Sequence, residues 1–339
     1  MKILTRTLKL TLLLWGWTAT MAAAQVALPT LSNYISEDNP AAAQWARNSV
    51  VAVTYFNLKF NGDFNWSQPP LSGSGTVNGN QTETNVDLRW KEPGYSLTLG
   101  SMNITQAQDM AQAAGPSAEQ MKTDQINLSG TTLVREKLAL GGHYADSTEV
   151  KTNTDPLGST TSTLTTIETL WGASLNLAEG VFLGLASGKS KLSNYNERDG
   201  ASSAEQFSYM YGLGYRSLGE DFSYQVEWNR IENEGFYVQK STTGAMNFGQ
   251  LNRQKSTTKL NLEAMMGDIS AGLGYSNESQ QGSDFNLTIL FAGYNPPGGV
   301  SLTLIYLNFD QKSSKSSFGS SEDFKMKGSG FGLTAGYAF

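Results

Sequence analysis

The sequence predicts an all-β fold, a transmembrane antiparallel β-barrel of about fourteen strands with a short N-terminal segment before it. Three observations support this prediction. Apolar and polar residues alternate along the chain after Val50, tight turns separate the alternating segments, and no later run reaches 18 unbroken apolar residues. Helical membrane spans are therefore excluded. A closed sheet is the other structure that satisfies every backbone hydrogen bond within lipid.

Residues 1–24 have the three parts of a secretory signal peptide. Lys2 and Arg6 belong to a basic start, a short apolar stretch follows, and Met21–Ala24 ends in small residues. This pattern predicts export and cleavage before Gln25. The chain contains no Cys, which excludes a lipid anchor at the cleavage site, a disulfide scaffold and any thiolate metal site.

Alternation is clearest in residues 207–215, where Phe207, Tyr209, Tyr211, Leu213 and Tyr215 fall on one face. Small or less apolar residues occupy the other face of the same segment. The same pattern, followed through residues 50–339, gives the expected barrel strands. They are 50–60, 82–91, 95–104, 124–134, 138–149, 162–177, 181–192, 205–218, 221–233, 254–266, 269–279, 284–294, 300–311 and 326–339.

The connections between these segments alternate in length. Tight turns such as 92–94 and 135–137 are followed by longer polar stretches such as 61–81 and 234–253. Outer-membrane barrels have short periplasmic turns and longer external loops. The alternation therefore predicts an outer-membrane barrel with an even number of strands and both termini in the periplasm.

The expected outer face is apolar and carries aromatic residues near strand ends. The pattern assigns Leu97, Leu287, Ile289 and Leu304, among others, to the lipid face. At the end of the chain, Tyr337 and Phe339 resemble the C-terminal signal by which such barrels are recognised for assembly. The expected partners are thus outer-membrane lipid, lipopolysaccharide and the barrel-assembly machinery.

Catalytic and metal-binding sets are not evident in the sequence. His143 is the only histidine; the residue two further along its strand is Ala145, and Ser147 lies four residues away, too far for a Ser–His pair. Acidic residues are scattered over different expected loops, so we expect no metal and no cofactor. The net charge is −6, and the sequence has no block of basic residues. Nucleic acid is therefore not an expected partner. The sequence therefore predicts that the chain is not an enzyme.

Two kinds of residue are expected to face the lumen, the space enclosed by the strands. Charged residues such as Asp87, Arg89 and Lys189 indicate a water-filled or salt-bridged interior. Apolar residues on lumenal phases indicate a patch for a hydrophobic solute, or a surface that packs under the N-terminal segment. These apolar candidates are Leu170, Met210, Met265, Leu290, Ile305, Leu307 and Phe309.

The N-terminal segment, residues 25–49, contains Asn39, Pro40 and Ala41 and precedes a first strand that begins at Val50. This order resembles the outer-membrane transporter family for long-chain fatty acids and aromatic hydrocarbons. Members of that family have a 14-stranded barrel and an N-terminal hatch with an N-P-A motif. The resemblance implies that residues 25–49 form a hatch or plug, and that the chain takes up hydrophobic small molecules passively.

Residues 84–103 resemble the second and third strands of the same family. There, the third strand kinks inward and opens a lateral gap in the wall. The resemblance implies Gly100 as the position for such a kink, since glycine tolerates a bend in a strand. Two other functions remain compatible with the sequence: a general diffusion porin with a water-filled lumen, and a structural or adhesive barrel that acts through external loops.

Overall fold

The structure is a computed structural model. It describes residues 41, 49–68, 71–112, 116–155, 158–178, 180–197, 200–218, 222–240, 246–280, 283–294, 296, 299–317 and 320–338. The expected signal peptide, residues 1–24, lies outside these ranges. Of the segment 25–49, only Ala41 and Ser49 are described. Among the described residues, no helix is long and apolar enough to cross a membrane.

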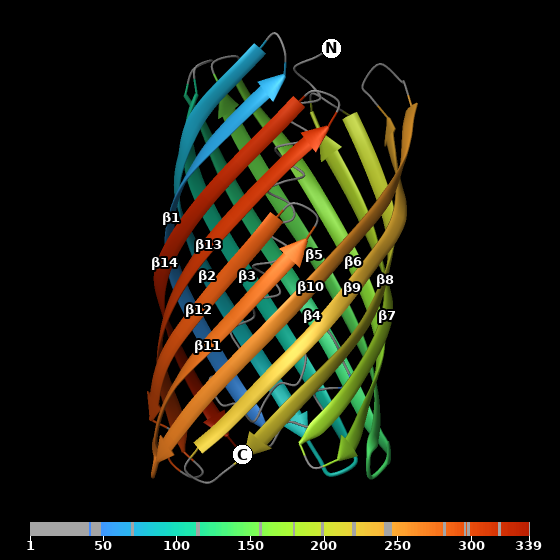
Figure 1. The fold of residues 1–339 in the computed structure, drawn as a ribbon, viewed down its shortest axis with the longest axis vertical. Coiled ribbons are helices and arrows are strands. Elements are labelled where there is room, and N and C mark those ends of the chain that lie inside the picture. The colour runs from blue at the N-terminus through green and yellow to red at the C-terminus, as the bar shows by residue number, and fades with distance from the viewer. Residues whose placement is uncertain are drawn as a thin grey trace.

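The described strands form one closed antiparallel barrel in which each strand pairs with its neighbours in the chain and β1 pairs with β14 (Figure 1). The predicted fold class is therefore confirmed. The strands are β1 (Val50–Gln68), β2 (Leu71–Lys91), β3 (Tyr95–Gln112), β4 (Ser117–Arg135), β5 (Leu138–Asp155), β6 (Gly158–Ala178), β7 (Val181–Asn196), β8 (Gly200–Leu218), β9 (Phe222–Lys240), β10 (Met246–Met266), β11 (Ile269–Gln280), β12 (Ser283–Tyr294), β13 (Val300–Ser317) and β14 (Ser320–Ala338).

We call the end of the barrel where β1 begins and β14 ends the terminal end, and the opposite end the distal end. At the terminal end, the strands begin and end within one residue of the predicted positions. At the distal end, the expected long loops are wrong: residues 61–81 continue as β1 and β2, with only 69–70 between the strands. The same correction applies to 234–253, most of which lies in β9 and β10.

The reason for this error lies in the outer face of the strands. Near the terminal end of β1, the outward Val51, Val53 and Tyr55 are apolar and exposed. Further along the same face come Asn57 and Lys59, which are also exposed. A strand needs about 9–11 residues to cross a bilayer, whereas β1 has 19. The distal half of the barrel therefore projects beyond the apolar band, and there the outward residues of β1 are polar while Leu58 and Phe60 stay buried in the lumen.

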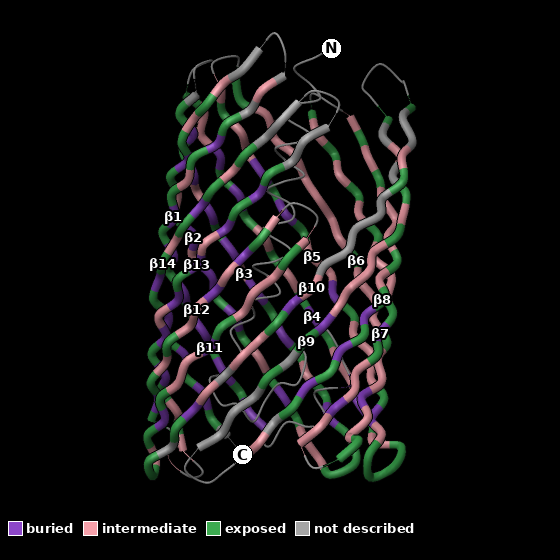
Figure 2. The backbone as a smooth tube through the Cα atoms, in the orientation of Figure 1, coloured by how far each residue is buried: buried purple, intermediate pink, exposed green. Residues whose placement is uncertain are grey.

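Burial alternates along most strands, as expected for a barrel with a filled interior (Figure 2). In β1 the even-numbered residues Ala52, Thr54 and Phe56 are buried, and the odd-numbered ones between them are exposed. The buried face is the lumenal face. At its terminal end, the Ser49 hydroxyl accepts a hydrogen bond from the Lys91 amide at 2.9 Å, which continues the β1–β2 contact beyond the strands.

The hairpin of β11 and β12 is shorter than its neighbours. Each of its two strands has 12 residues, whereas β10 has 21 and β13 has 18. All four strands begin or end together at the terminal end, so the difference lies wholly at the distal end. Figure 1 shows β11 and β12 ending well below the distal ends of β10 and β13. The barrel wall is therefore lower here than elsewhere.

Candidate lumenal binding site

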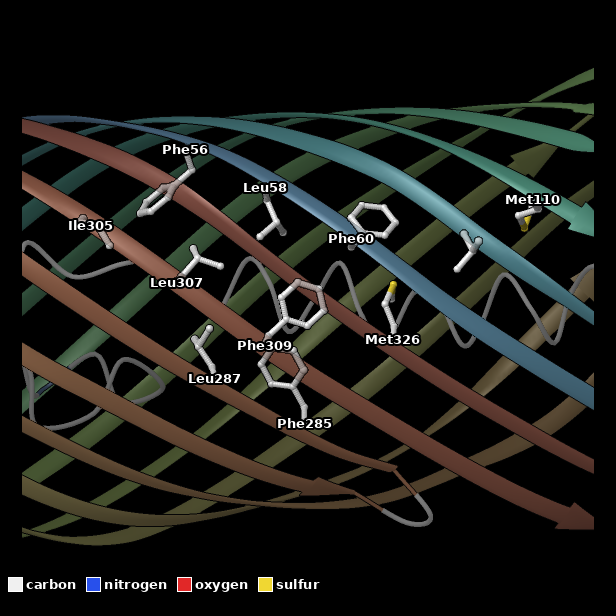
Figure 3. Close-up of a cluster of buried hydrophobic side chains, with 11 residues drawn as sticks. Phe56, Leu58, Phe60, Met110, Phe285, Leu287, Ile305, Leu307, Phe309 and Met326 are labelled. Atoms are coloured by element: carbon white, nitrogen blue, oxygen red, sulfur yellow. The ribbon is translucent and has the colours of Figure 1, made fainter.

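A cluster of buried apolar side chains lies on one side of the lumen (Figure 3). It spans six adjacent strands in the barrel order β3, β2, β1, β14, β13 and β12. We call it the lumenal cluster. Its members are Phe56, Leu58, Phe60, Val77, Met110, Phe285, Leu287, Ile305, Leu307, Phe309 and Met326, with Ile289, Phe291 and Phe324 packed against it.

Aromatic rings form the centre of the lumenal cluster. Phe285 and Phe309 stack with their ring centroids 5.8 Å apart and their planes at 28°. Such offset pairs stabilise each other beyond the area that they bury. Since the two residues come from adjacent strands, the pair joins β12 to β13 on the lumenal face.

Several rings of this region lie over a glycine on the next strand. Phe309 is opposite Gly328, and a Cβ built on Gly328 would lie 2.5 Å from Cζ of that ring. Phe56 covers Gly332 in the same way, and a Cβ there would lie 2.8 Å from its Cζ. An aromatic ring over a cross-strand glycine covers backbone that has no side chain of its own. The glycines thus let these rings lie along the wall.

A second arc of the lumen, from β3 to β5, contains a chain of buried polar side chains beside the buried Met102, Ile104 and Met121. Gln106 Nε2 donates to Gln108 Oε1 at 3.2 Å, and Gln108 Nε2 donates to Glu119 Oε1 at 2.9 Å. Lys151 Nζ lies 2.6 Å from the second carboxylate oxygen of Glu119. All four side chains are buried. The described lumen therefore has the apolar lumenal cluster on one side and a hydrogen-bonded polar chain, set among apolar residues, across β3 to β5.

The structure places some of the predicted apolar residues together and others apart. Ile305, Leu307 and Phe309 are buried on the lumenal face and belong to the lumenal cluster. Met210 is buried on β8, outside the cluster. Leu170 is half-buried on β6, on the same face as the buried Ser174. The structure thus selects three of the seven candidates as one contiguous surface.

The lumenal assignment of Leu290 is wrong. Its side chain is 48% exposed and lies on the outer face of β12, while Leu287 is buried on the lumenal face. The assignments of Leu287 and Ile289 to lipid are wrong for the same reason. Apolar and polar residues alternate at the start of β12, but alternation alone does not show which face lies in lipid; here the apolar face lines the lumen and the outer face carries Asp284 and Asn286. Met265 lies in β10 in register with Ser270, but its side chain is outside the described part.

Lys189 also lies on the outer face rather than in the lumen. It forms an ion pair with Glu205 and lies 5.2 Å from the ring centroid of the outward Phe207. Asp87 and Arg89 keep their predicted lumenal face. The lumenal face of β7 therefore has fewer charged side chains than the sequence predicts.

The expected gap at Gly100 is absent from the described wall. Gly100 pairs with Asp87 on β2 and Asn127 on β4, and both registers continue through it without a shift. A Cβ at Gly100 would lie 2.8 Å from Nδ2 of Asn127 and from Oδ1 of Asp87. The glycine is therefore explained by crowding on the lumenal face, and β3 stays in the sheet.

The remaining motif residues are only partly described. Asn39 and Pro40 of the expected hatch lie outside the described residues, while Ala41 is fully buried. Tyr337 is exposed on the outer face near the end of β14, and Phe339 is outside the described residues. The roles of these residues in closing the barrel and in its assembly stay predictions.

His143, the only histidine, has a cross-strand contact that the sequence of its own strand does not reveal. Ser129 on β4 lies opposite His143 on β5, and its Oγ is 2.7 Å from His143 Nδ1. The contact depends on the register between β4 and β5, which the spacing of residues within one strand does not contain. In a Ser–His hydrolase a third group orients the imidazole. Among the described residues, no carboxylate is hydrogen-bonded to His143, and no three His, Asp or Glu side chains form a potential metal site.

Comparison with known proteins identifies the fold. No family model and no curated protein matches the chain. Among solved structures, a deltaS2S3 mutant of TodX, a monoaromatic hydrocarbon channel, matches with a TM-score of 0.60 and 8% identity, over 89% of this chain and 93% of that chain. A Pseudomonas aeruginosa FadL homologue matches with a TM-score of 0.55 and 12% identity, over 89% and 93%.

The monoaromatic hydrocarbon channel CymD matches with a TM-score of 0.51 and 13% identity, over 89% of this chain and 91% of that chain. The chain has the fold of these channels. Its closed sheet and its apolar outer band near the terminal end satisfy the two physical requirements for crossing lipid with strands. The chain is therefore an outer-membrane β-barrel.

Proposed function

We propose that the chain is a passive outer-membrane channel for hydrophobic small molecules, related to the fatty-acid and aromatic-hydrocarbon transporters. The lumenal cluster is the observation that carries this proposal. It gathers eleven buried apolar side chains on one side of the lumen. Apolar surface of this kind favours an apolar occupant over water by about 25 cal/mol for each Å² buried. The similar fold of TodX, CymD and the FadL homologue supports it.

The members of the cluster are at most 8% exposed, so a ring or an alkyl chain would have to part side chains such as Phe285 and Phe309 in order to bind. The solute would then exchange water contacts for aromatic and aliphatic ones. The polar arc from β3 to β5 would face any polar group of the same molecule. We further propose that residues 1–24 are a signal peptide and that residues 25–49 are a hatch over this surface. Lipid, lipopolysaccharide and the barrel-assembly machinery are the proposed partners.

Uptake of a radiolabelled monoaromatic or long-chain apolar compound tests the function. Cells that lack other routes should gain uptake when they express the chain. Leu307→Ala should lower this uptake, because it removes apolar surface from the cluster. Met210→Ala is the matched control, since Met210 is also buried and lumenal but lies outside the cluster. A folded barrel that gives no uptake would reject the function.

A general diffusion porin is the second candidate, and the buried polar arc that includes Glu119 and Lys151 favours it. Conductance in planar bilayers separates the two functions. A silent barrel that conducts after deletion of residues 25–49 would support a hatch and hydrophobic uptake. Steady conductance in the intact chain would support the porin. The adhesive alternative predicts loss of partner binding on changing distal turns, with no effect of Leu307→Ala.

A further inference from the structure

The barrel wall has a step above β11 and β12. Residues 246–254 of β10 pair with β9 and have no partner on β11. Residues 314–317 of β13 pair with β14 and have no partner on β12. Among the described strands, β11 and β12 are the two neighbours that both end before the distal ends of the strands beside them. The step is visible in Figure 1 between β10 and β13.

The step is large compared with a small molecule. At about 3.4 Å per residue, it runs roughly 30 Å along β10 and roughly 14 Å along β13. Three strand spacings of about 4.8 Å put the β10 and β13 backbones about 14 Å apart across it. This width is enough for an aromatic ring or an alkyl chain to pass between the strands.

The floor of the step is the distal end of the β11–β12 hairpin, and on β11 it lies five residues, roughly 17 Å along the strand, beyond the end of the apolar outer band. On the outer face of β11, the last large apolar residue is Tyr275, whose hydroxyl donates to Asn286 Oδ1 at 2.9 Å. Asn277 also donates to this oxygen, at 2.7 Å. A tyrosine with polar neighbours is typical of the membrane–water interface. Molecules at the outer boundary of the bilayer therefore face a shorter polar wall here than at β1, where thirteen residues follow the outward Tyr55.

The lumenal side of the same hairpin is apolar almost from its tip. Phe285 is the third residue of β12, is buried, and stacks on Phe309. Outward-facing Asp284 beside it is exposed. On the opposite side of the barrel, by contrast, the distal wall presents the buried polar chain of Gln108 and Glu119. The lumenal cluster therefore begins directly behind the lowest part of the wall.

We propose that the step above β11 and β12 is a side entrance, through which hydrophobic molecules pass from the outer boundary of the membrane to the lumenal cluster. The inference rests on the proposed function, because it names the route by which that site is filled. A molecule that crosses the β11–β12 hairpin meets Phe285 after three residues of wall. It crosses less exposed polar surface than it would on the longer neighbouring strands.

The entrance can be blocked after the protein has folded, because the chain has no Cys of its own. Ser279→Cys places a thiol on the exposed outer face next to the β11–β12 turn, and a bulky polyethylene-glycol maleimide would then cover the step. Ser159→Cys is the matched control, exposed next to the distal turn between β5 and β6. Modification of the Ser279→Cys variant should abolish most of the uptake of the labelled apolar compound, whereas modification of the Ser159→Cys variant should leave it unchanged.

A second measurement does not depend on transport. Phe285→Cys in whole cells should react rapidly with N-phenylmaleimide, a small apolar reagent added from outside. The same thiol should react far more slowly when a polar hairpin inserted at residues 281–282 extends β11 and β12 to the height of their neighbours. Heat-modifiable migration on gels would confirm that both variants are folded barrels.

The two measurements separate the entrance from the function. Unchanged uptake after modification of Ser279→Cys, or equal labelling of Phe285→Cys in both hairpin lengths, would overturn the side entrance. Absence of uptake by the unmodified chain, with labelling that still depends on hairpin length, would reject the proposed function while the opening itself stands. Loss of uptake at both modified sites would show a general effect of the polymer and would also overturn the entrance.

Discussion

The pairing of Phe309 with Gly328 gives a sharp test of how the lumenal cluster is built. In Gly328→Ala, the new methyl group would lie 2.5 Å from Cζ of Phe309 and 2.7 Å from the backbone oxygen of Lys59. Real Cβ atoms do not approach other heavy atoms this closely. The ring is 1% exposed and stacked on Phe285, so it cannot move without disturbing the cluster. We expect a loss of about 1–3 kcal/mol of unfolding free energy, the usual cost of overpacking.

The assay is urea unfolding of the refolded barrel in lipid vesicles, followed by tryptophan fluorescence. Gly130→Ala on β4 is the matched control, because a Cβ there meets no atom within 4 Å. It should change the unfolding free energy by less than about 0.5 kcal/mol. In Gly328→Ala combined with Phe309→Leu, the smaller side chain should remove part of the clash, with a coupling of at least about 0.5 kcal/mol. Equal effects of the two glycine substitutions would refute the account of rings lying over glycines.

Three further predictions concern the outer face, the polar arc and the histidine. Leu304 is 63% exposed within the apolar band, and Leu304→Arg should lower the free energy of unfolding in vesicles by about 2–4 kcal/mol. Asn308→Arg, further along β13, should lower it by about 0–1 kcal/mol. Equal losses would contradict our placement of the band. Lys151→Met leaves Glu119 buried without its cation and should lower the free energy of unfolding by about 3–5 kcal/mol. Adding Glu119→Gln should restore part of this free energy. No recovery would argue against the ion pair. Ser129→Ala should leave uptake unchanged, and loss of an ester-hydrolysing activity in that variant would show that the chain is an enzyme.

The sequence predicts this fold well where one face of each strand is in lipid. In β1 the alternation of Val51, Val53 and Tyr55 with smaller or buried residues locates the strand, because lipid demands an apolar outer face. Beyond Tyr55 the outward residues are Asn57 and Lys59, so the apolar outer face that identifies a strand in lipid is lost. Pairing between β1 and β2 continues to Gln68 all the same. Backbone pairing with neighbouring strands keeps the distal halves in the sheet. The residue pattern of a single strand does not show this pairing.

The site was predicted less completely than the fold. The sequence assigns Ile305, Leu307 and Phe309 to the lumenal face, and in part of β13 the outward residues that alternate with them are polar. Leu287 and Leu290 were assigned to the wrong faces, since alternation separates the two faces of β12 but does not show which of them lies in lipid. The contact of His143 with Ser129 depends on the register between β4 and β5. Register between strands is a tertiary property, so one chain's pattern does not contain it.

The change in the outer face along each strand also fixes how deep the protein sits. One continuous backbone ladder passes through two solvents, lipid near the terminal end and water beyond, and the outward residues mark the boundary between them. On β13 that boundary falls between Tyr306 and Asn308. Exchanging residues there would move the whole cylinder up or down relative to the bilayer, because mismatch between apolar length and lipid thickness costs free energy. Depth in the membrane is thus a property that selection can tune without altering the interior.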